Sequence, residues 1–241
     1  MSTVPTVARA AGPRDVISLQ FANPTRLVTI PLAILLAVVA VASIVSRVVT
    51  ISAQGSGAVD TDANGSVLWS LLGFMVAVGV QAVSVAFPLS LALGSTRRTF
   101  TAGVLLTAVL EAALLTASAL VLLGLELLTG GWFVGARVLG DPTLGGGNVL
   151  VLATVMFLAT LTAILAGAVF GAAWVRFGAL GPLVLGVSLA AAAVIALLLL
   201  APALGALGDA FEPWWLAVAA LVVVAASTAG THLLLRRAAV R

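Results

Sequence analysis

The 241-residue chain contains no cysteine and no lysine, and its one histidine is His232. Without cysteine it cannot form a disulfide, a thiolate nucleophile or a sulfur-ligated metal site. Without lysine it has no Schiff-base chemistry and no P-loop, because the lysine that reaches the β and γ phosphates is missing. One histidine cannot make an HExxH zinc site. We therefore expect that this chain is not an enzyme, does not hydrolyse ATP itself, and binds no metal or cofactor.

Charge is also scarce. Only 8% of the residues are charged and 62% are hydrophobic, and the mean hydropathy is +1.27. These values predict an integral membrane protein. The abundance of alanine, leucine, valine and glycine, with arginine as the only strong base, is typical of a high-GC bacterial genome, so we expect a bacterial plasma membrane. The arginines lie mainly on one predicted side of the membrane, which explains the excess of positive charge. We therefore expect no nucleic-acid partner.

Six apolar segments are long enough to cross about 30 Å of hydrocarbon. We therefore predict an all-α, polytopic membrane protein with six transmembrane helices. The predicted parts are an interfacial N-terminal segment over 1–27, a transmembrane domain over 28–235 and a short tail over 236–241. The six spans are expected at 28–49, 67–93, 102–124, 149–171, 179–201 and 214–235.

The arginines of the connections predict the orientation. Nine of the eleven fall in the two terminal segments and in the second and fourth connections, which the positive-inside rule makes cytoplasmic. Both termini are therefore expected in the cytoplasm. These nine are Arg9, Arg14, Arg26, Arg97, Arg98, Arg176, Arg236, Arg237 and Arg241.

The second connection, within FPLSLALGSTRRTF (87–100), has an unusual pattern. Gly94 can end a helix, Ser95 or Thr96 can cap a following turn, and Phe100 can anchor the return. Such a stretch can build a short helix along the inner surface, whose arginines point toward a docked partner. The alternative is that Arg97 and Arg98 only hold the loop in the cytoplasm.

The run GVQAVSVAFPLSLALGSTRRTFTAG (79–103) resembles the signature of a family of Gram-positive ABC transporter permeases. GGWFVGARVLGDP (130–142) and GAAWVRFGALGP (171–182) resemble that family as well. The matching positions in the first run are Gln81, Phe87, Pro88, Gly94, Arg97, Arg98, Phe100 and Gly103.

The resemblance implies a six-helix permease subunit of an ABC-2-type exporter. Such a family works as two membrane subunits on two separate ATP-binding subunits, so the expected partners are an ABC ATPase, which would carry ATP and Mg, and a second or paralogous permease. The loop between helices two and three would be a coupling helix. The implied partner-coupling residues are Gly94, Ser95, Thr96, Arg97, Arg98, Thr99 and Phe100.

Several polar residues fall inside the predicted spans. Glu111 is either a cation or proton contact in a translocation path, which Gln81 and Ser84 could also line, or a helix-packing group hydrogen-bonded to Gln81. Arg47 is expected to snorkel to the interface instead of pairing with Glu111. The pattern Gly167-x-x-x-Gly171 predicts a close helix contact, within or between subunits.

Two other functions stay open. One is a six-helix substrate-binding module that serves a separate energising complex. The other is an intramembrane enzyme of the rhomboid type, although no GxSG motif accompanies His232. In the N-terminal segment, the family resemblance favours an amphipathic helix over 13–21 that lies on the inner leaflet. The glycine-rich stretch LGGGN (144–148) is expected to be a flexible loop.

Overall fold

The computed structural model describes residues 12–21, 25–53, 66–203 and 212–238. All regular structure in these residues is helical, which confirms the all-α fold class. The elements are α1 (Pro13–Gln20), η1 (Thr25–Thr29), α2 (Ile30–Ala53), α3 (Ser66–Ser84), α4 (Ala86–Ala92), α5 (Arg97–Leu128), η2 (Gly131–Gly135), η3 (Pro142–Leu144), α6 (Val149–Phe177), α7 (Leu180–Leu200), η4 (Ala201–Ala203) and α9 (Trp214–Arg236).

Within the described residues, six helical stretches are long and apolar enough to cross a membrane. The chain is thus a multi-pass membrane protein, as its composition predicts. The third stretch begins at Arg97 and ends at Leu128, so it is longer at both ends than the predicted 102–124. The polar ends of this helix are stabilised by contacts of Arg97 and Glu126 with the rest of the protein, which hydropathy alone does not reveal.

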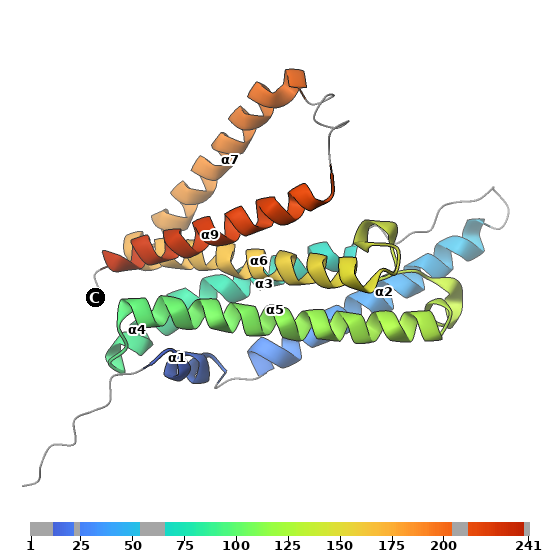
Figure 1. The fold of residues 1–241 in the computed structure, drawn as a ribbon, viewed down its shortest axis with the longest axis horizontal. Coiled ribbons are helices and arrows are strands. Elements are labelled where there is room, and N and C mark those ends of the chain that lie inside the picture. Colours follow the sequence, from blue (N-terminus) through green and yellow to red (C-terminus); the bar gives the residue numbers. More distant parts are fainter. Residues whose placement is uncertain (1–11, 22–24, 54–65, 204–211, 239–241) are drawn as a thin grey trace, which may run out of the picture.

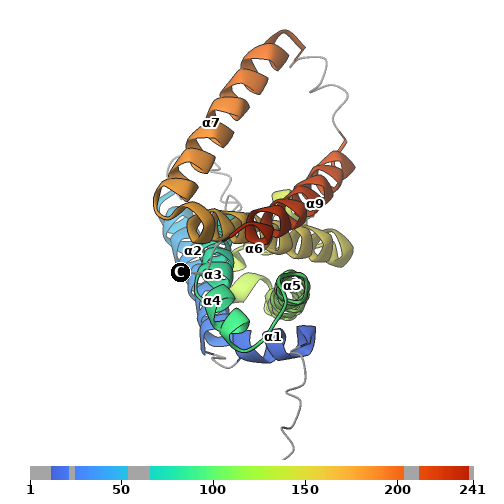
Figure 2. The same cartoon turned by 90° about the vertical axis from the view of Figure 1, so that its left-hand side faces the viewer.

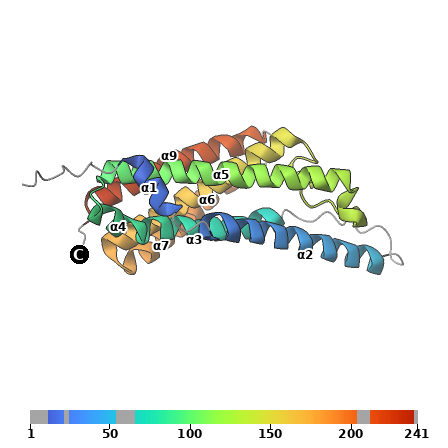
Figure 3. The same ribbon diagram turned by 90° about the horizontal axis from the view of Figure 1, so that it is seen from below.

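Three helices form the centre of the molecule. α6 packs against both α3 and α5, while α2 lies along α3 and α9 lies along α6. α1, α4 and the end of α9 lie at one end of this bundle, on the left in Figure 1 and again in Figure 3. We call it the turn end, because residues 93–96 connect α4 to α5 there. The other is the loop end, where residues 129–148 connect α5 to α6.

The second predicted span, 67–93, is divided into two helices at Val85. Pro88 is the physical cause. A proline inside a helix has no N–H to donate to the residue four positions earlier, and its ring clashes with that carbonyl, here that of Ser84. The short α4 that results carries the chain from α3 to the 93–96 turn.

Glycines allow α3 and α6 to touch through their backbones. A Cβ atom on Gly79 would lie 1.9 Å from the carbonyl oxygen of Ile164, and one on Gly167 would lie 2.1 Å from that of Val76. At Gly171 the corresponding distance, to the carbonyl oxygen of Val80, is 2.4 Å. The Gly167-x-x-x-Gly171 pattern therefore serves packing within this chain.

α7 leaves the bundle at its first turn. Gly181 packs so closely on α6 that a Cβ there would lie 2.3 Å from the carbonyl oxygen of Ala173. Beyond that contact α7 diverges from α6 and α9, as Figures 1 and 2 show. None of its most apolar 18-residue stretch is buried within the protein. Its leucine and valine side chains are therefore available to lipid or to another protein.

We predict that Gly167→Ala destabilises the bundle by about 3 kcal/mol, the upper part of the range for overpacked cores, because backbone atoms of α3 cannot move aside singly. The measurement is the apparent melting temperature of the purified protein in detergent. Gly73→Ala in α3 is the control, since its Cβ would meet nothing within 4 Å. Equal melting temperatures for the two variants would contradict the close-contact assignment.

Candidate functional site

The 93–96 turn is a well-defined helix stop. Gly94 has a φ of +85°, which glycine adopts without strain. The N–H of Gly94 donates to the carbonyl of Leu91 at 3.0 Å, and the N–H of Ser95 donates to that of Ser90 at 3.0 Å. This pair of bonds is the Schellman motif, which satisfies the last carbonyls of a helix. Gly94 therefore ends α4, as the sequence predicts.

Two phenylalanines and a glycine hold the elements around the turn. The rings of Phe87 in α4 and Phe100 in α5 meet edge to face, with centroids 5.2 Å apart, and both are fully buried. Gly103 lets α1 lie against α5, since a Cβ there would come within 2.6 Å of the Val16 Cβ. These contacts give Phe87, Phe100 and Gly103 a packing role at the turn end of this chain.

α1 forms over Pro13–Gln20, where the resemblance favours a helix. The N–H of Gly12 donates to the Asp15 carboxylate at 2.6 Å, which caps the first turn. Val16 is buried and packs with Phe87 and Phe100 in the same apolar cluster. α1 is thus docked on α4 and α5 at the turn end.

The structure corrects the expected shape of the second connection. No separate surface helix contains the two arginines. Thr96 caps α5 itself, because its Oγ1 accepts the N–H of Thr99 at 3.2 Å, and Arg97 and Arg98 form the first turn of that 32-residue helix. A single capping threonine suffices to start the span, and Ser95, which is buried, does not act as the cap.

The two arginines differ in their surroundings. The Arg97 guanidinium donates to the carbonyl oxygen of Arg236 and, at 2.8 Å, to that of Ala238. The first carbonyl belongs to the last residue of α9 and the second lies two residues beyond it, where a helix leaves acceptors unpaired and a cation is favoured. Arg97 therefore joins the start of α5 to the end of α9 and does not point toward an outside partner, whereas Arg98 is exposed.

The turn end is positively charged. Arg14, Arg98, Arg236 and Arg237 are exposed there. Asp15 is the one acidic side chain at this end among the residues that the structure describes, and it is engaged in capping α1. The exposed surface of this end is thus suited to an anionic partner.

Glu111 lies inside the bundle, with 1% of its surface exposed. Within the described part of the chain, neither carboxylate oxygen has a hydrogen-bond partner, and the hydroxyl of Thr107, one turn earlier on the same face of α5, has none either. The proposed hydrogen bond to Gln81 is wrong, since Gln81 is exposed. Arg47 is exposed and does not pair with Glu111, and Ser84 is half-buried.

Glu126 at the loop end is the residue that sequence reasoning missed. It is 2% exposed, and its carboxylate accepts four hydrogen bonds from the segment that follows. The donors are the indole of Trp132 at 2.9 Å and the backbone N–H groups of Val138 at 3.1 Å, Leu139 at 2.9 Å and Gly140 at 2.8 Å. The sequence did contain a signal for this role: Glu126 is a single carboxylate that precedes a glycine-rich loop containing a tryptophan.

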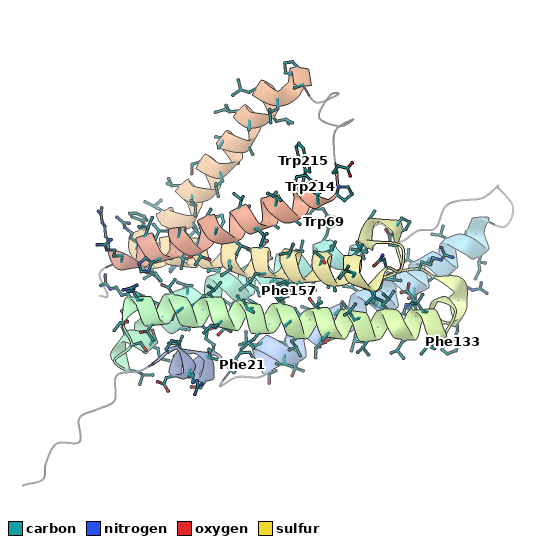
Figure 4. All side chains as sticks on the ribbon, viewed as in Figure 1. Phe21, Trp69, Phe133, Phe157, Trp214 and Trp215 are labelled. Carbon is teal, nitrogen blue, oxygen red and sulfur yellow. The ribbon has the colours of Figure 1, made fainter. Side chains whose placement is uncertain are left out.

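This loop has unusual backbone geometry. Trp132 and Phe133 have φ values of +58° and +61°, a conformation that costs a side-chain-bearing residue of the order of 1 kcal/mol. The geometry directs the Trp132 indole to Glu126, while Phe133 projects outward at the loop end, as Figure 4 shows. A cavity of about 460 Å³ lies beside it, lined by Glu126, Arg137 and several glycines.

The glycine-rich stretch 144–148 is ordered into a turn. Gly145, Gly146 and Gly147 all have positive φ, and the N–H of Gly146 donates to the carbonyl of Asp141 at 2.9 Å. Asn148 then caps α6, because its side-chain oxygen accepts the N–H groups of Leu150 and Val151. The glycines supply turn geometry that other residues adopt only with strain.

Comparison of the chain with family models, with curated proteins and with solved structures found no match.

The two buried glutamates of α5 lead to opposite predictions. Glu111→Met should raise the free energy of unfolding by about 1 to 3 kcal/mol, because it removes a buried polar group that has no partner. Glu126→Met should lower it by about 3 kcal/mol or more, because four donors lose their acceptor. Thermal unfolding of the two variants in the same detergent measures both. Changes of the same sign would contradict the assigned hydrogen bonding.

Arg97 gives a further prediction. Arg97→Ala should destabilise the end of α9 by about 1.5 kcal/mol, the lower range for hydrogen bonds from a charged group, because the site is half-exposed. The measurement is the rate of trypsin cleavage after Arg236 and Arg237, followed by mass spectrometry of the released C-terminal peptides. Arg14→Ala, also at the turn end, is the control and should leave that rate unchanged. An equal rate in both variants would argue against the bridge.

Proposed function

We propose that this chain is the membrane-spanning permease subunit of an ABC-type exporter, with a separate ATP-binding subunit that docks at the turn end. The support is the combination of six candidate spans, the lack of any P-loop lysine and the mechanical character of the 93–96 turn. A chain that cannot bind ATP through a P-loop needs an outside source of energy to drive transport.

The observation that carries the proposal is that the 93–96 turn is tied to several helices at once. Phe87 and Phe100 join α4 to α5, Gly103 admits α1, and Arg97 joins α5 to the end of α9. A force applied at this turn would therefore move α1, α4, α5 and α9 together. This is the property that a coupling element needs in order to transmit the closure of two ATP-binding subunits.

The exposed groups of the turn suit a protein partner. Gly94, Thr96 and Arg98 are exposed, with Arg236 and Arg237 close by in the same end of the bundle. A guanidinium binds a carboxylate through two parallel hydrogen bonds, which fixes the partner's orientation as well as its position. We propose an acidic surface on the ATP-binding subunit as the counterpart, with the turn end facing the cytoplasm of a bacterial cell.

The second permease subunit is proposed to cover α7. Most leucines and valines of α7 are exposed, so this helix can face lipid. Because it also diverges from its own bundle, it offers a surface to a second copy or to a paralogous subunit. Two permeases would also match two ATP-binding subunits in number. A substrate-binding module, in contrast, would act as a single copy in its complex.

Glu111 is proposed to contact the transported molecule or a cation during the change of access. Its support is the unpartnered carboxylate beside the unpartnered hydroxyl of Thr107, in the middle of a span. Gln81 lies elsewhere on the surface, where it lines a cavity of about 150 Å³ with Gln20 of α1.

We expect Arg98→Glu to reduce recovery of the ATP-binding subunit with the tagged permease by at least about fivefold, because the reversal replaces attraction with repulsion. The two chains would be expressed together, purified through the permease, and assayed for ATPase turnover. Arg137→Glu is the matched control, since Arg137 is exposed at the loop end and carries the same charge change. Unchanged recovery and turnover in the Arg98 variant would count against docking at this turn.

A further inference from the structure

A groove runs between α5 and α9 on the side of the bundle, beginning at the turn end. It has a volume of about 530 Å³ and is lined by Arg98, Thr101, Ala102, Leu105, Val224, Ala225, Thr228, Ala229 and His232. Ala102, Ala225 and Ala229 are exposed. Because these side chains are small, the groove is open to the medium around the two spans, where the bilayer would lie.

The two walls of the groove run antiparallel, so its chemistry changes with depth. Arg98 and His232 lie at the turn end of α5 and α9, while Leu105 and Val224 lie farthest from it. The seven steps from residue 98 to residue 105 correspond to about 10 Å along the helix axis. The hydrocarbon of one leaflet is about 15 Å thick, half of a 30 Å core. With Arg98 at headgroup level, as the positive-inside rule leads us to expect, the groove would extend through most of one leaflet.

Charge is confined to one end of the groove. The Arg98 guanidinium is exposed and has no hydrogen bond or ion pair within the described part of the chain. Among the described residues, no aspartate or glutamate lines the groove. The other end is bounded by alanine, leucine and valine side chains. The groove thus combines a cationic mouth with an apolar interior.

We propose that this groove binds one anionic phospholipid, with its phosphate at Arg98 and His232 and an acyl chain along Ala102, Ala225 and Ala229. The match is one of charge and depth: a phosphate is anionic at headgroup level, and a guanidinium binds it through two hydrogen bonds. Soluble phosphate would meet only the mouth, and the apolar interior would stay unfilled.

Binding at this site needs no ATPase, because both of its walls belong to this chain, although it shares Arg98 with the docking surface proposed above. Occupation would tie α5 to α9 at a second place, beside the bridge from Arg97 to the end of α9. A bound lipid would therefore contribute to the rigidity of the turn end whether or not the chain is a transporter subunit.

The experiment uses the purified full chain, without any partner, in detergent micelles doped with phosphatidylglycerol or phosphatidylcholine. Native mass spectrometry measures the lipid that stays bound. The wild type is expected to retain one phosphatidylglycerol in preference to phosphatidylcholine. Arg98→Gln should lower that preference about fivefold, which is the effect of one arginine at an anionic surface. Arg14→Gln, at the same end but outside the groove, should leave the preference unchanged.

A second pair of variants tests the interior. Ala229→Phe fills the groove with a ring and should remove the bound lipid, whereas Ala226→Phe adds the same ring on an exposed part of α9 that does not line it. Melting temperatures check that both variants fold. Added inorganic phosphate should not displace the lipid.

Three results would overturn the proposal. Equal retention of phosphatidylglycerol in the Ala229 and Ala226 variants would place the lipid elsewhere. Equal binding of the two lipids by the wild type would overturn the preference for an anionic headgroup. If the wild type forms a dimer in micelles without added phospholipid, and Ala229→Phe converts that dimer to a monomer, the groove is occupied by a second copy of the chain. The first two outcomes leave the proposed docking of an ATPase untouched.

Discussion

The backbone contact between α3 and α6 is the constraint on which the rest of the structure depends. Gly79, Gly167 and Gly171 leave so little space that no side chain fits between the two helices. In a bilayer, where lipid tails are as apolar as leucine, such close approach replaces the hydrophobic effect as the source of helix association. α3 then fixes α4 and the 93–96 turn, and α6 fixes α5, α9 and the first turn of α7.

The turn end and the loop end are held together by different kinds of interaction. At the turn end the elements are joined by aromatic packing, a glycine contact and one guanidinium that binds carbonyls of α9. At the loop end a single carboxylate gathers one indole and three backbone N–H groups. Arg97, whose charge the sequence assigns to membrane sidedness, thus acts chiefly inside the protein, as Glu126 does at the loop end. Arg98 remains exposed beside an apolar groove.

The sequence predicted the class of fold because hydropathy over about 20 residues reports on membrane burial directly. It also identified the helix stop at Gly94, since glycine and a Schellman motif are local features. It failed where partners come from distant segments. The carbonyls at the end of α9 that Arg97 contacts lie about 140 positions further along the chain. The break at Val85 was missed because the apolar character of 67–93 predicts one continuous helix, although Pro88 lies three residues after the break. Gly79 has no spacing signal comparable to that of Gly167 and Gly171.

Glu126 also makes the two ends mechanically unequal. Because its carboxylate holds the segment from Trp132 to Gly140 against the last turn of α5, that segment is braced to the 32-residue helix. The loop end of α5 is thus fastened by bonds to its own connection, whereas the turn end is fastened by contacts with other helices.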